Sequence, residues 1–141
     1  FPTRRSSDLM LAGVAGLLVA CGGANKIVEP SDLNEQRVFF DFDSSVINEE
    51  ARNNLLGQSL YMKNHPETKI QIAGNCDERG TTEYNLGLGA RRANAAKAVM
   101  VKDGVEAKRI STISYGKERP WKLGSGESVW KMNRNATTTV K

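Results

Sequence analysis

Polar and apolar residues alternate with a period of two just after residue 37, which is typical of a β-strand. Val38, Phe40 and Phe42 fall on one face of this segment. The period then lengthens to that of a helix, which begins after Asn48, a favourable N-cap residue followed by two glutamates. The helix is predicted to stop at residues 65–66, where a proline follows a histidine. Its apolar positions are Ala51, Leu55, Leu56 and Met62.

The rest of the chain continues this alternation of strand and helix. A second strand is followed by a polar turn and a long helix, which either Thr81 or Thr82 can cap and which Gly104 can end. In chain order, the further elements are a strand at 70–74, a helix from 81 or 82 to about 102, a strand at 110–115, a short helix at 128–132 and a strand at 136–140. This β-α-β-α-β-α-β order predicts an α/β (α+β) two-layer sandwich, with the helices packed on one face of a mixed sheet.

An uninterrupted run of apolar and small residues, 10–20, precedes Cys21. This run is too short to span a bilayer as a helix, but its length fits the apolar region of a signal peptide. Residues 18–21, Leu-Val-Ala-Cys, resemble a bacterial lipobox. That resemblance implies that the chain is cut before Cys21 and that this cysteine is lipidated. The alternatives are an ordinary signal peptide or a buried helix that contains a cysteine.

The chain therefore divides into four segments. Residues 1–9 read like the translation of a sequencing adapter and are interpreted as non-native or artefactual, the alternative being a genuine basic n-region. Residues 10–20 are the signal-peptide apolar region with the lipobox. Residues 21–36 are interpreted as the lipidated N-terminus and a polar, flexible tether. Residues 37–141 are expected to form a single folded domain.

Composition excludes two classes of protein. Of the 141 residues, 39% are hydrophobic and 26% are charged, which is enough for one modest core but not for a membrane bundle. The formal net charge is +4, and it falls to +3 without residues 1–20, which hold two arginines and one aspartate. A charge this small, without a Lys/Arg stripe interleaved with aromatic residues, argues against nucleic-acid binding.

Few residues could support catalysis or metal binding. The single histidine, His65, stands at a predicted helix end and no CxxC pair is present, so we expect neither a zinc site nor a catalytic triad. The segment from residue 41 begins like a calcium loop, but Val46 replaces the turn glycine and Arg52 the closing glutamate. Asp41 and Asp43 could form the carboxylate pair of a hydrolase, although no aromatic sugar groove accompanies them. We expect no catalysis, no metal and no cofactor.

The second cysteine and several aromatic residues are interpreted as structural. Cys76 has no partner if Cys21 is acylated, and the adjacent Asp77 disfavours its thiolate. Two phenylalanines and one tryptophan are expected in the core, and Trp121 in a partly exposed loop. The three expected core residues are Phe40, Phe42 and Trp130.

The polar turn before the long helix holds the best candidate for a binding site. A helix N-terminus presents free N–H groups, which suit carboxylates. On this helix Asn85, Leu88 and Arg92 share one face, whereas Arg91 points about 100° away. Asp77 on the turn could take an ammonium while Arg92 forks onto a carboxylate, so that together they hold a zwitterion. Alternatively the two side chains form a structural salt bridge, and the spacing alone does not choose between these interpretations.

Three segments together resemble the OmpA-like domain of the peptidoglycan-associated lipoprotein (Pal) family: 74–93 (GNCDERGTTEYNLGLGARRA), 39–43 (FFDFD) and 114–118 (SYGKE). The resemblance covers about residues 38–140 and implies a pocket for the diaminopimelate side chain of an uncrosslinked stem peptide. It implies that Asp77 and Arg92 recognise the charged ends of that side chain. The remaining pocket residues that it implies are Asp43, Arg79, Thr81, Tyr84, Asn85 and Leu88.

The same resemblance implies a cellular setting. The expected partners are peptidoglycan, a TolB-like periplasmic β-propeller protein, and the outer membrane through the lipid on Cys21, with the domain facing the periplasm. Gly22 agrees with the outer membrane, because an aspartate there would favour retention at the inner membrane. The resemblance further implies that the protein holds the outer membrane to the wall during division. The alternatives are an OmpA-like lipoprotein outside the Tol system and a cell-wall hydrolase.

Three positions depart from the family pattern. Asn135 stands where the family has the second arginine of a C-terminal Asn-Arg-Arg-Ala motif. Gly87 and Gly89 lie inside the long predicted helix, where each glycine costs about 1 kcal/mol relative to alanine. These departures bear on stability and partner affinity more than on ligand recognition.

Overall fold

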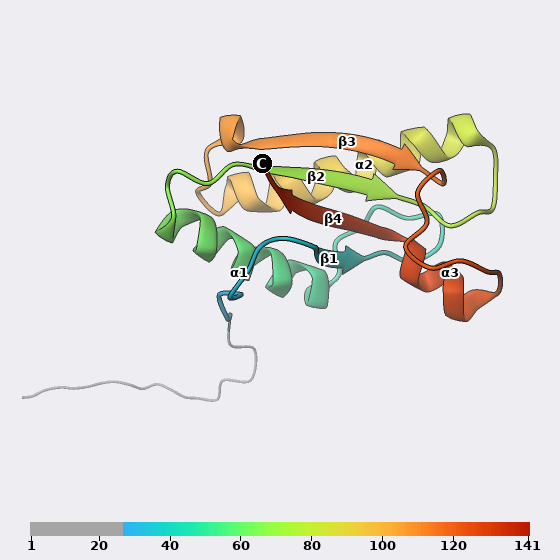
Figure 1. Ribbon diagram of the computed structural model, residues 1–141, viewed down its shortest axis with the longest axis horizontal. Coiled ribbons are helices and arrows are strands. Elements are labelled where there is room, and N and C mark those ends of the chain that lie inside the picture. The colour runs from blue at the N-terminus through green and yellow to red at the C-terminus, as the bar shows by residue number, and fades with distance from the viewer. Residues whose placement is uncertain (1–26) are drawn as a thin grey trace, which may run out of the picture.

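The computed structural model describes residues 27–141, which fold as a four-stranded mixed sheet with helices against it (Figure 1). The predictions for residues 1–9, for the apolar run 10–20 and for lipidation at Cys21 fall outside the described residues. The elements are β1 (Gln36–Phe39), α1 (Glu49–Asn64), β2 (Ile70–Asn75), α2 (Thr82–Lys102), the 3-10 turn η2 (Ala107–Arg109), β3 (Ile110–Gly116), α3 (Glu127–Asn133) and β4 (Asn135–Val140). This order and the mixed sheet confirm the predicted fold class.

The strands lie in the order β1-β4-β2-β3. β2 and β3 are parallel and are joined by the crossover helix α2, as parallel neighbours require. The last strand, β4, inserts between β1 and β2 and is antiparallel to both. Its first residue, Asn135, pairs with Asn75 at the end of β2. The sheet thereby brings the residues that follow β2 next to those that precede β4.

The core lies between one face of the sheet and helices α1 and α2. Helix α2 makes the larger contact and packs along β2 and β3, while α1 lies beneath β1 (Figure 1). The side chains of this core are at most 3% exposed, and they come from each of the four strands and both long helices. They include Val38, Ala51, Leu55, Met62, Ile70, Ile72, Ala93, Ala96, Met100, Ile110 and Ala136.

Both long helices begin and end where the sequence indicates. The Asn48 side chain accepts a hydrogen bond from the Ala51 amide at 2.8 Å, and Thr81 accepts one from the Tyr84 amide at 3.0 Å. These bonds satisfy amides that have no partner within the first helical turn. Gly104 follows α2 with a φ of 108°, a conformation that suits glycine after a helix end.

The first strand is shorter than the sequence predicted. It ends at Phe39, and the Arg134 Nε donates to the Phe40 carbonyl at 2.8 Å in place of a further strand bond. At Asp43 the backbone turns into the left-handed region, with a φ of 53°. Phe42 is therefore 58% exposed, and its prediction as a core residue is wrong, whereas Phe40 is 3% exposed and belongs to the core.

The packed part of the chain begins before residue 37, the predicted start of the domain. Leu33 is fully buried, and the Glu35 amide donates to the Thr138 carbonyl at 2.8 Å just before β1 begins at Gln36. The predicted tether, residues 21–36, therefore ends sooner than expected, because its one leucine in this stretch fills the core. Among residues 27–141, no helix is both long and apolar enough to cross a membrane.

Candidate ligand-binding pocket

A pocket of about 360 Å³ opens where β2 ends and α2 begins. The eight residues predicted to bind a ligand all line it: Asp43, Asp77, Arg79, Thr81, Tyr84, Asn85, Leu88 and Arg92. Phe42, Cys76 and Gly80 complete the lining. The segment after β1 thus meets the turn after β2 and the first turns of α2 at one end of the sheet, although it is far from them in sequence.

The turn between β2 and α2 is held by hydrogen bonds from both of its ends. The Cys76 amide donates to the Gly116 carbonyl at 2.8 Å, which ties the turn to β3. The Asn85 side chain reaches back from α2 and donates to the Arg79 carbonyl at 2.8 Å. Gly80 has a φ of 98°, a conformation that L side chains rarely adopt. The backbone that shapes the pocket is therefore set by local bonds.

Arg92 is the most deeply buried charged residue of the pocket, with 1% of its surface exposed. Its Nε, Nη1 and Nη2 donate to three backbone carbonyls, those of Ser44 at 2.8 Å, Asn75 at 2.9 Å and Asp41 at 3.1 Å. These bonds connect α2 to β2 and to the segment after β1. Of the five N–H groups of a guanidinium, one on each Nη is left for Cys76 or for a ligand.

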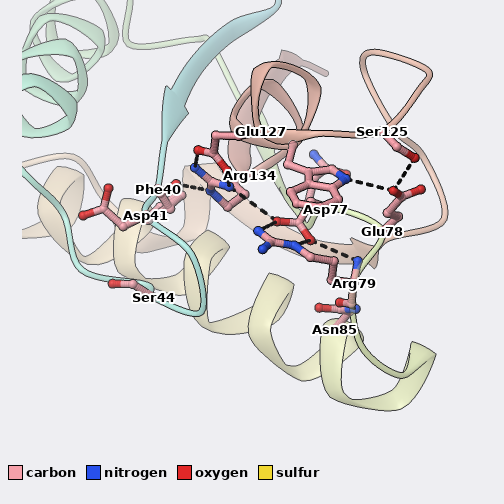
Figure 2. Close-up of polar contacts among 12 residues, drawn as sticks. Phe40, Asp41, Ser44, Asp77, Glu78, Arg79, Asn85, Ser125, Glu127 and Arg134 are labelled. Atoms are coloured by element: carbon pink, nitrogen blue, oxygen red, sulfur yellow. Dashed lines mark hydrogen bonds and ion pairs between the residues drawn. The ribbon is translucent and has the colours of Figure 1, made fainter.

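Asp77 does not pair with Arg92, so the alternative of a structural salt bridge between these two residues is wrong. Its carboxylate instead accepts from the Arg79 side chain at 2.8 and 3.2 Å and from the Arg79 amide at 3.0 Å, as Figure 2 shows in part. Arg134 lies 3.5 Å away on the other side. Burial raises the pKa of Asp77, but the hydrogen bonds from Arg79 and Arg134 outweigh it and hold the pKa below its usual value.

The Arg79 guanidinium lies between two aromatic rings. Phe42 and Trp130 each have their ring centroid 4.0 Å from it. The indole of Trp130 in turn donates to Glu78 at 2.8 Å, and Ser125 donates to the same carboxylate oxygen at 2.6 Å (Figure 2). Helix α3 and the loop before it therefore form one wall behind the Asp77–Arg79 pair. Trp130, expected in the core, is half-buried and contacts a charge instead.

Asp43 and Tyr84 form the outer edge of the pocket. The Tyr84 hydroxyl donates a hydrogen bond to the Asp43 carboxylate, and this bond raises the pKa of Tyr84. Both residues are exposed, in contrast to the buried Asp77 and Arg92. The pocket thus holds one acidic group at its mouth and one inside, and of its two arginines Arg92 is buried and Arg79 is half-buried.

Cys76 lines the pocket, but its thiol is not activated. The residue is 3% exposed, and its thiol donates to the Asn85 carbonyl at 3.3 Å. Burial is the main cause that raises its pKa, and the charge of Asp77 adds to it while that of Arg92 opposes it. The structural role predicted from the sequence agrees with this geometry, although burial matters more than the neighbouring aspartate.

Sequence reasoning missed the residues that α3 and its end contribute. Arg134 is 6% exposed and bonds the Phe40 carbonyl, the Glu127 carboxylate at 2.9 Å and, more weakly, Asp77 (Figure 2). The available signal was its place directly before the last strand, next to Asn135, where a buried arginine must find acceptors. Among residues 27–141, no group of three or more His, Cys, Asp or Glu could hold a metal ion.

Comparison with known proteins agrees with this architecture. The family model described as "OmpA family" matches residues 39–134. A peptidoglycan-associated lipoprotein of Mesorhizobium japonicum is 48% identical over 104 residues, which cover 74% of this chain and 62% of that protein. The chain thus spans less than two thirds of the length of this relative. A peptidoglycan-associated lipoprotein of Pasteurella multocida is 37% identical, with 91% of this chain and 93% of that protein covered.

Solved structures show the same fold. The crystal structure of the peptidoglycan-associated lipoprotein from Burkholderia pseudomallei matches with a TM-score of 0.73 and 40% identity, over 76% of this chain and 91% of that chain. The C-terminal domain of Helicobacter pylori MotB matches with a TM-score of 0.70 over 75% of this chain and 84% of that chain. At 19% identity, this second likeness concerns the fold alone.

Proposed function

The chain belongs to the OmpA family, and from this membership we propose that it is a lipid-anchored outer-membrane protein that binds peptidoglycan non-covalently. The observation that carries the proposal is the pocket itself, in which two aspartates and two arginines surround a cavity of about 360 Å³. Such a set of charges complements a zwitterion. The diaminopimelate side chain of an uncrosslinked stem peptide ends in an ammonium and a carboxylate on one carbon and is our proposed ligand.

In this proposal Arg92 holds the ligand carboxylate and Asp77 the ammonium. One N–H group on each Nη of Arg92 is not bonded to a carbonyl and can donate to a carboxylate. Asp77 already accepts four contacts from Arg79 and Arg134, so an ammonium reaches it only if Arg79 withdraws. Arg79 is 32% exposed at its side chain, which leaves it room to move towards solvent.

We propose binding without catalysis. A general acid in glycan hydrolysis needs a carboxyl whose pKa is raised, whereas hydrogen bonds hold that of Asp77 below its usual value. Asp43, the second carboxylate of the pocket, is engaged by the Tyr84 hydroxyl. Purified sacculi incubated with the chain should therefore release no soluble fragments, and release of muropeptides would establish the hydrolase alternative instead.

We further propose that the chain works in the Tol-Pal system and supports envelope integrity and cell division by tethering the outer membrane to the wall. Relatives that bear the name peptidoglycan-associated lipoprotein support this setting. The partner implied is a TolB-like periplasmic β-propeller protein. A pull-down with TolB separates this role from that of a wall-binding lipoprotein outside the Tol system, because only a member of the Tol-Pal system would bind TolB.

The central experiment is a calorimetric titration of the purified chain with a diaminopimelate-containing stem peptide. We expect saturable binding that weakens at least tenfold in Asp77→Ala, because this variant removes a charge-assisted contact of about 2–5 kcal/mol with the ammonium, and that also weakens in Asp43→Asn, which removes the second negative charge of the pocket. Asp43 is exposed, so its variant should remain folded if the buried Asp77→Ala does not. A matched peptide with lysine in place of diaminopimelate lacks the side-chain carboxylate and should bind weakly. No binding by the folded wild-type chain would refute the proposal.

A further inference from the structure

The face of the sheet that points away from α1 and α2 is not covered by any helix of residues 27–141 (Figure 1). Along each strand, successive side chains point to opposite faces of the sheet. Because Val38 and Ile72 are buried against the helices, the residues next to them in their strands point to the open face. Phe39 on β1 and Ile113 on β3 are each 37% exposed here, although a solvated sheet face is usually polar. Apolar side chains on an open sheet face indicate a surface that a partner covers.

The loop after β3 adds an aromatic and cationic cluster to this face. Trp121, 39% exposed, stacks on Phe39 with 6.1 Å between ring centroids. The Arg37 guanidinium lies 3.9 Å from the Trp121 ring, and Arg119 lies 3.9 Å from the ring of Tyr115. A hollow of about 260 Å³ over strands β1, β4 and β2 is bordered by Arg37, Tyr115, Arg119 and Trp121, and Phe39 lies beside it against Trp121. Tryptophan, tyrosine and arginine are the residues most enriched in the energetic centres of protein interfaces.

The charges of this cluster are unbalanced. Arg37 pairs with Glu35 at 2.7 Å. Arg119 and Lys122 contact aromatic rings, but among residues 27–141 neither has a carboxylate within ion-pair distance. Arg37 and Arg119 line the hollow with a single acidic residue, Glu35, and Lys122 lies beside it, 4.8 Å from the Trp121 ring. A second copy of the chain would bring the same excess of positive charge, so the electrostatic complement is an acidic partner.

Two buried polar atoms beside the hollow lack a hydrogen-bond partner. The described residues contain three such side-chain atoms, and two of them, Arg37 Nε and Asn75 Oδ1, belong to residues that line this hollow. Leaving a buried donor or acceptor unpaired costs about 1–3 kcal/mol. Because both atoms are themselves buried, a partner on the open face contacts the exposed side chains around them and not these two atoms.

We propose that this open face is a docking surface for an acidic segment of a partner protein. Carboxylates of the segment pair with Arg119 and Lys122, and an apolar side chain packs against Trp121 and Phe39. The surface shares no residue with the pocket described above. A stem peptide in the pocket and a protein on the open face can therefore be held together, and each can be tested without the other.

The test uses a panel of fluorescein-labelled decapeptides in which Asp or Glu alternates with Leu, Tyr or Trp, each compared with its Gln counterpart. Binding to the full chain is followed by fluorescence anisotropy, and the contact residues by NMR shift changes. We expect at least one acidic peptide to bind at least tenfold more tightly than its Gln counterpart. The shifted signals should include Phe39, Tyr115 and Trp121, and a saturating stem peptide should not displace the decapeptide.

A pair of charge-reversed variants makes the result specific. The double variant Arg119→Glu with Lys122→Glu should bind the acidic peptide at least tenfold more weakly than the wild type. Lys102→Glu with Lys108→Glu changes the net charge equally at exposed positions near the end of α2 and at η2, and it should leave the affinity within twofold. Any of three results would overturn the docking surface: an equal loss of peptide affinity in both double variants, NMR shift changes confined to the pocket, or no preference for acidic peptides over their Gln counterparts. Those outcomes leave the stem-peptide titration unaffected.

Discussion

Two adjacent arginines of α2 occupy opposite environments, and their positions illustrate what a single residue reveals before the structure is known. Helical spacing alone indicates that Arg91 and Arg92 cannot serve the same pocket. The structure places Arg92 inside, at 1% exposure, and leaves Arg91 exposed. What the spacing could not predict is the set of partners of Arg92, because three backbone carbonyls from distant segments become neighbours only in the folded sheet.

Arg92→Lys should therefore destabilise the chain although it keeps the charge. A lysine ammonium cannot reach three divergent carbonyls, and each buried acceptor left unpaired costs about 1–3 kcal/mol. We expect a loss of about 2–4 kcal/mol in the free energy of unfolding, measured by urea denaturation. Arg91→Lys is the matched control on the same helix and should change it by less than about 0.5 kcal/mol. Equal effects of the two substitutions would contradict the role assigned to Arg92.

The Asp77 ion pair predicts a dependence of stability on pH. The pKa of this carboxyl is lower in the folded chain than in the unfolded chain. Its contribution to the free energy of unfolding is therefore complete at pH values above the unfolded pKa of about 3.9, and it is lost as the pH falls through the folded pKa. Asp77→Asn should cost about 1–3 kcal/mol at pH 7, because Arg79 and Arg134 lose their shared acceptor. In urea denaturation, the gap between wild type and variant should narrow below pH 4. A gap of constant size from pH 7 to pH 3 would argue against this pair.

At the scale of elements, the sequence predicted the helices well because their ends carry local signals. Asn48 and Thr81 cap α1 and α2 through bonds within their own first turn. The end of β1 was not predictable in this way, since distant arginines capture the carbonyls of Phe40 and Asp41. The same limit explains why α3 was foreseen as a helix but not as the element that packs behind the Asp77–Arg79 pair.

The two glycines inside α2 differ in their packing, which the sequence could not show. A Cβ on Gly89 would lie 2.3 Å from the Ser114 Oγ and 2.8 Å from the Gly74 carbonyl, so this glycine lets α2 approach the sheet closely. A Cβ on Gly87 would lie 3.5 Å from an Arg91 side-chain nitrogen, which is an ordinary van der Waals contact. The cost in helix propensity at residue 89 is therefore offset by packing, whereas at residue 87 no such gain is evident.

Alanine substitutions should separate the two positions. Gly87→Ala should stabilise the chain by about 0.5–1 kcal/mol through helix propensity. Gly89→Ala should destabilise it by about 1–3 kcal/mol, because the methyl group forces α2 away from β2 and β3. Thermal and urea unfolding of both variants provide the measurement. Stabilisation by Gly89→Ala would show that the close contact between α2 and the sheet is not needed.

At the scale of the whole molecule, the N-terminal segment and the pocket lie at opposite ends of the sheet. Glu29 accepts a hydrogen bond from Asn64 at 2.8 Å, and the Val28 carbonyl lies against Gly57, so this segment runs along α1. Asn64 ends α1 just before β2 begins, whereas the pocket lies where β2 ends. A chain anchored to a membrane through residues before 27 would therefore present its pocket on the far side from the anchor. This arrangement suits a protein that links a membrane to a wall.

The proposed anchor can be tested with the two cysteines of the chain. Cys21 stands at the end of the apolar run, whereas Cys76 is buried and its pKa is raised by burial, so only Cys21 should accept a lipid. In Gram-negative cells labelled with radioactive palmitate, Cys21→Ser should abolish incorporation and move the chain to the soluble fraction. Cys76→Ser should retain both the label and the membrane fraction. Because the pocket is remote from the anchor, soluble Cys21→Ser should bind the stem peptide with unchanged affinity. Continued palmitate incorporation in Cys21→Ser would refute the lipobox interpretation and leave pocket recognition intact.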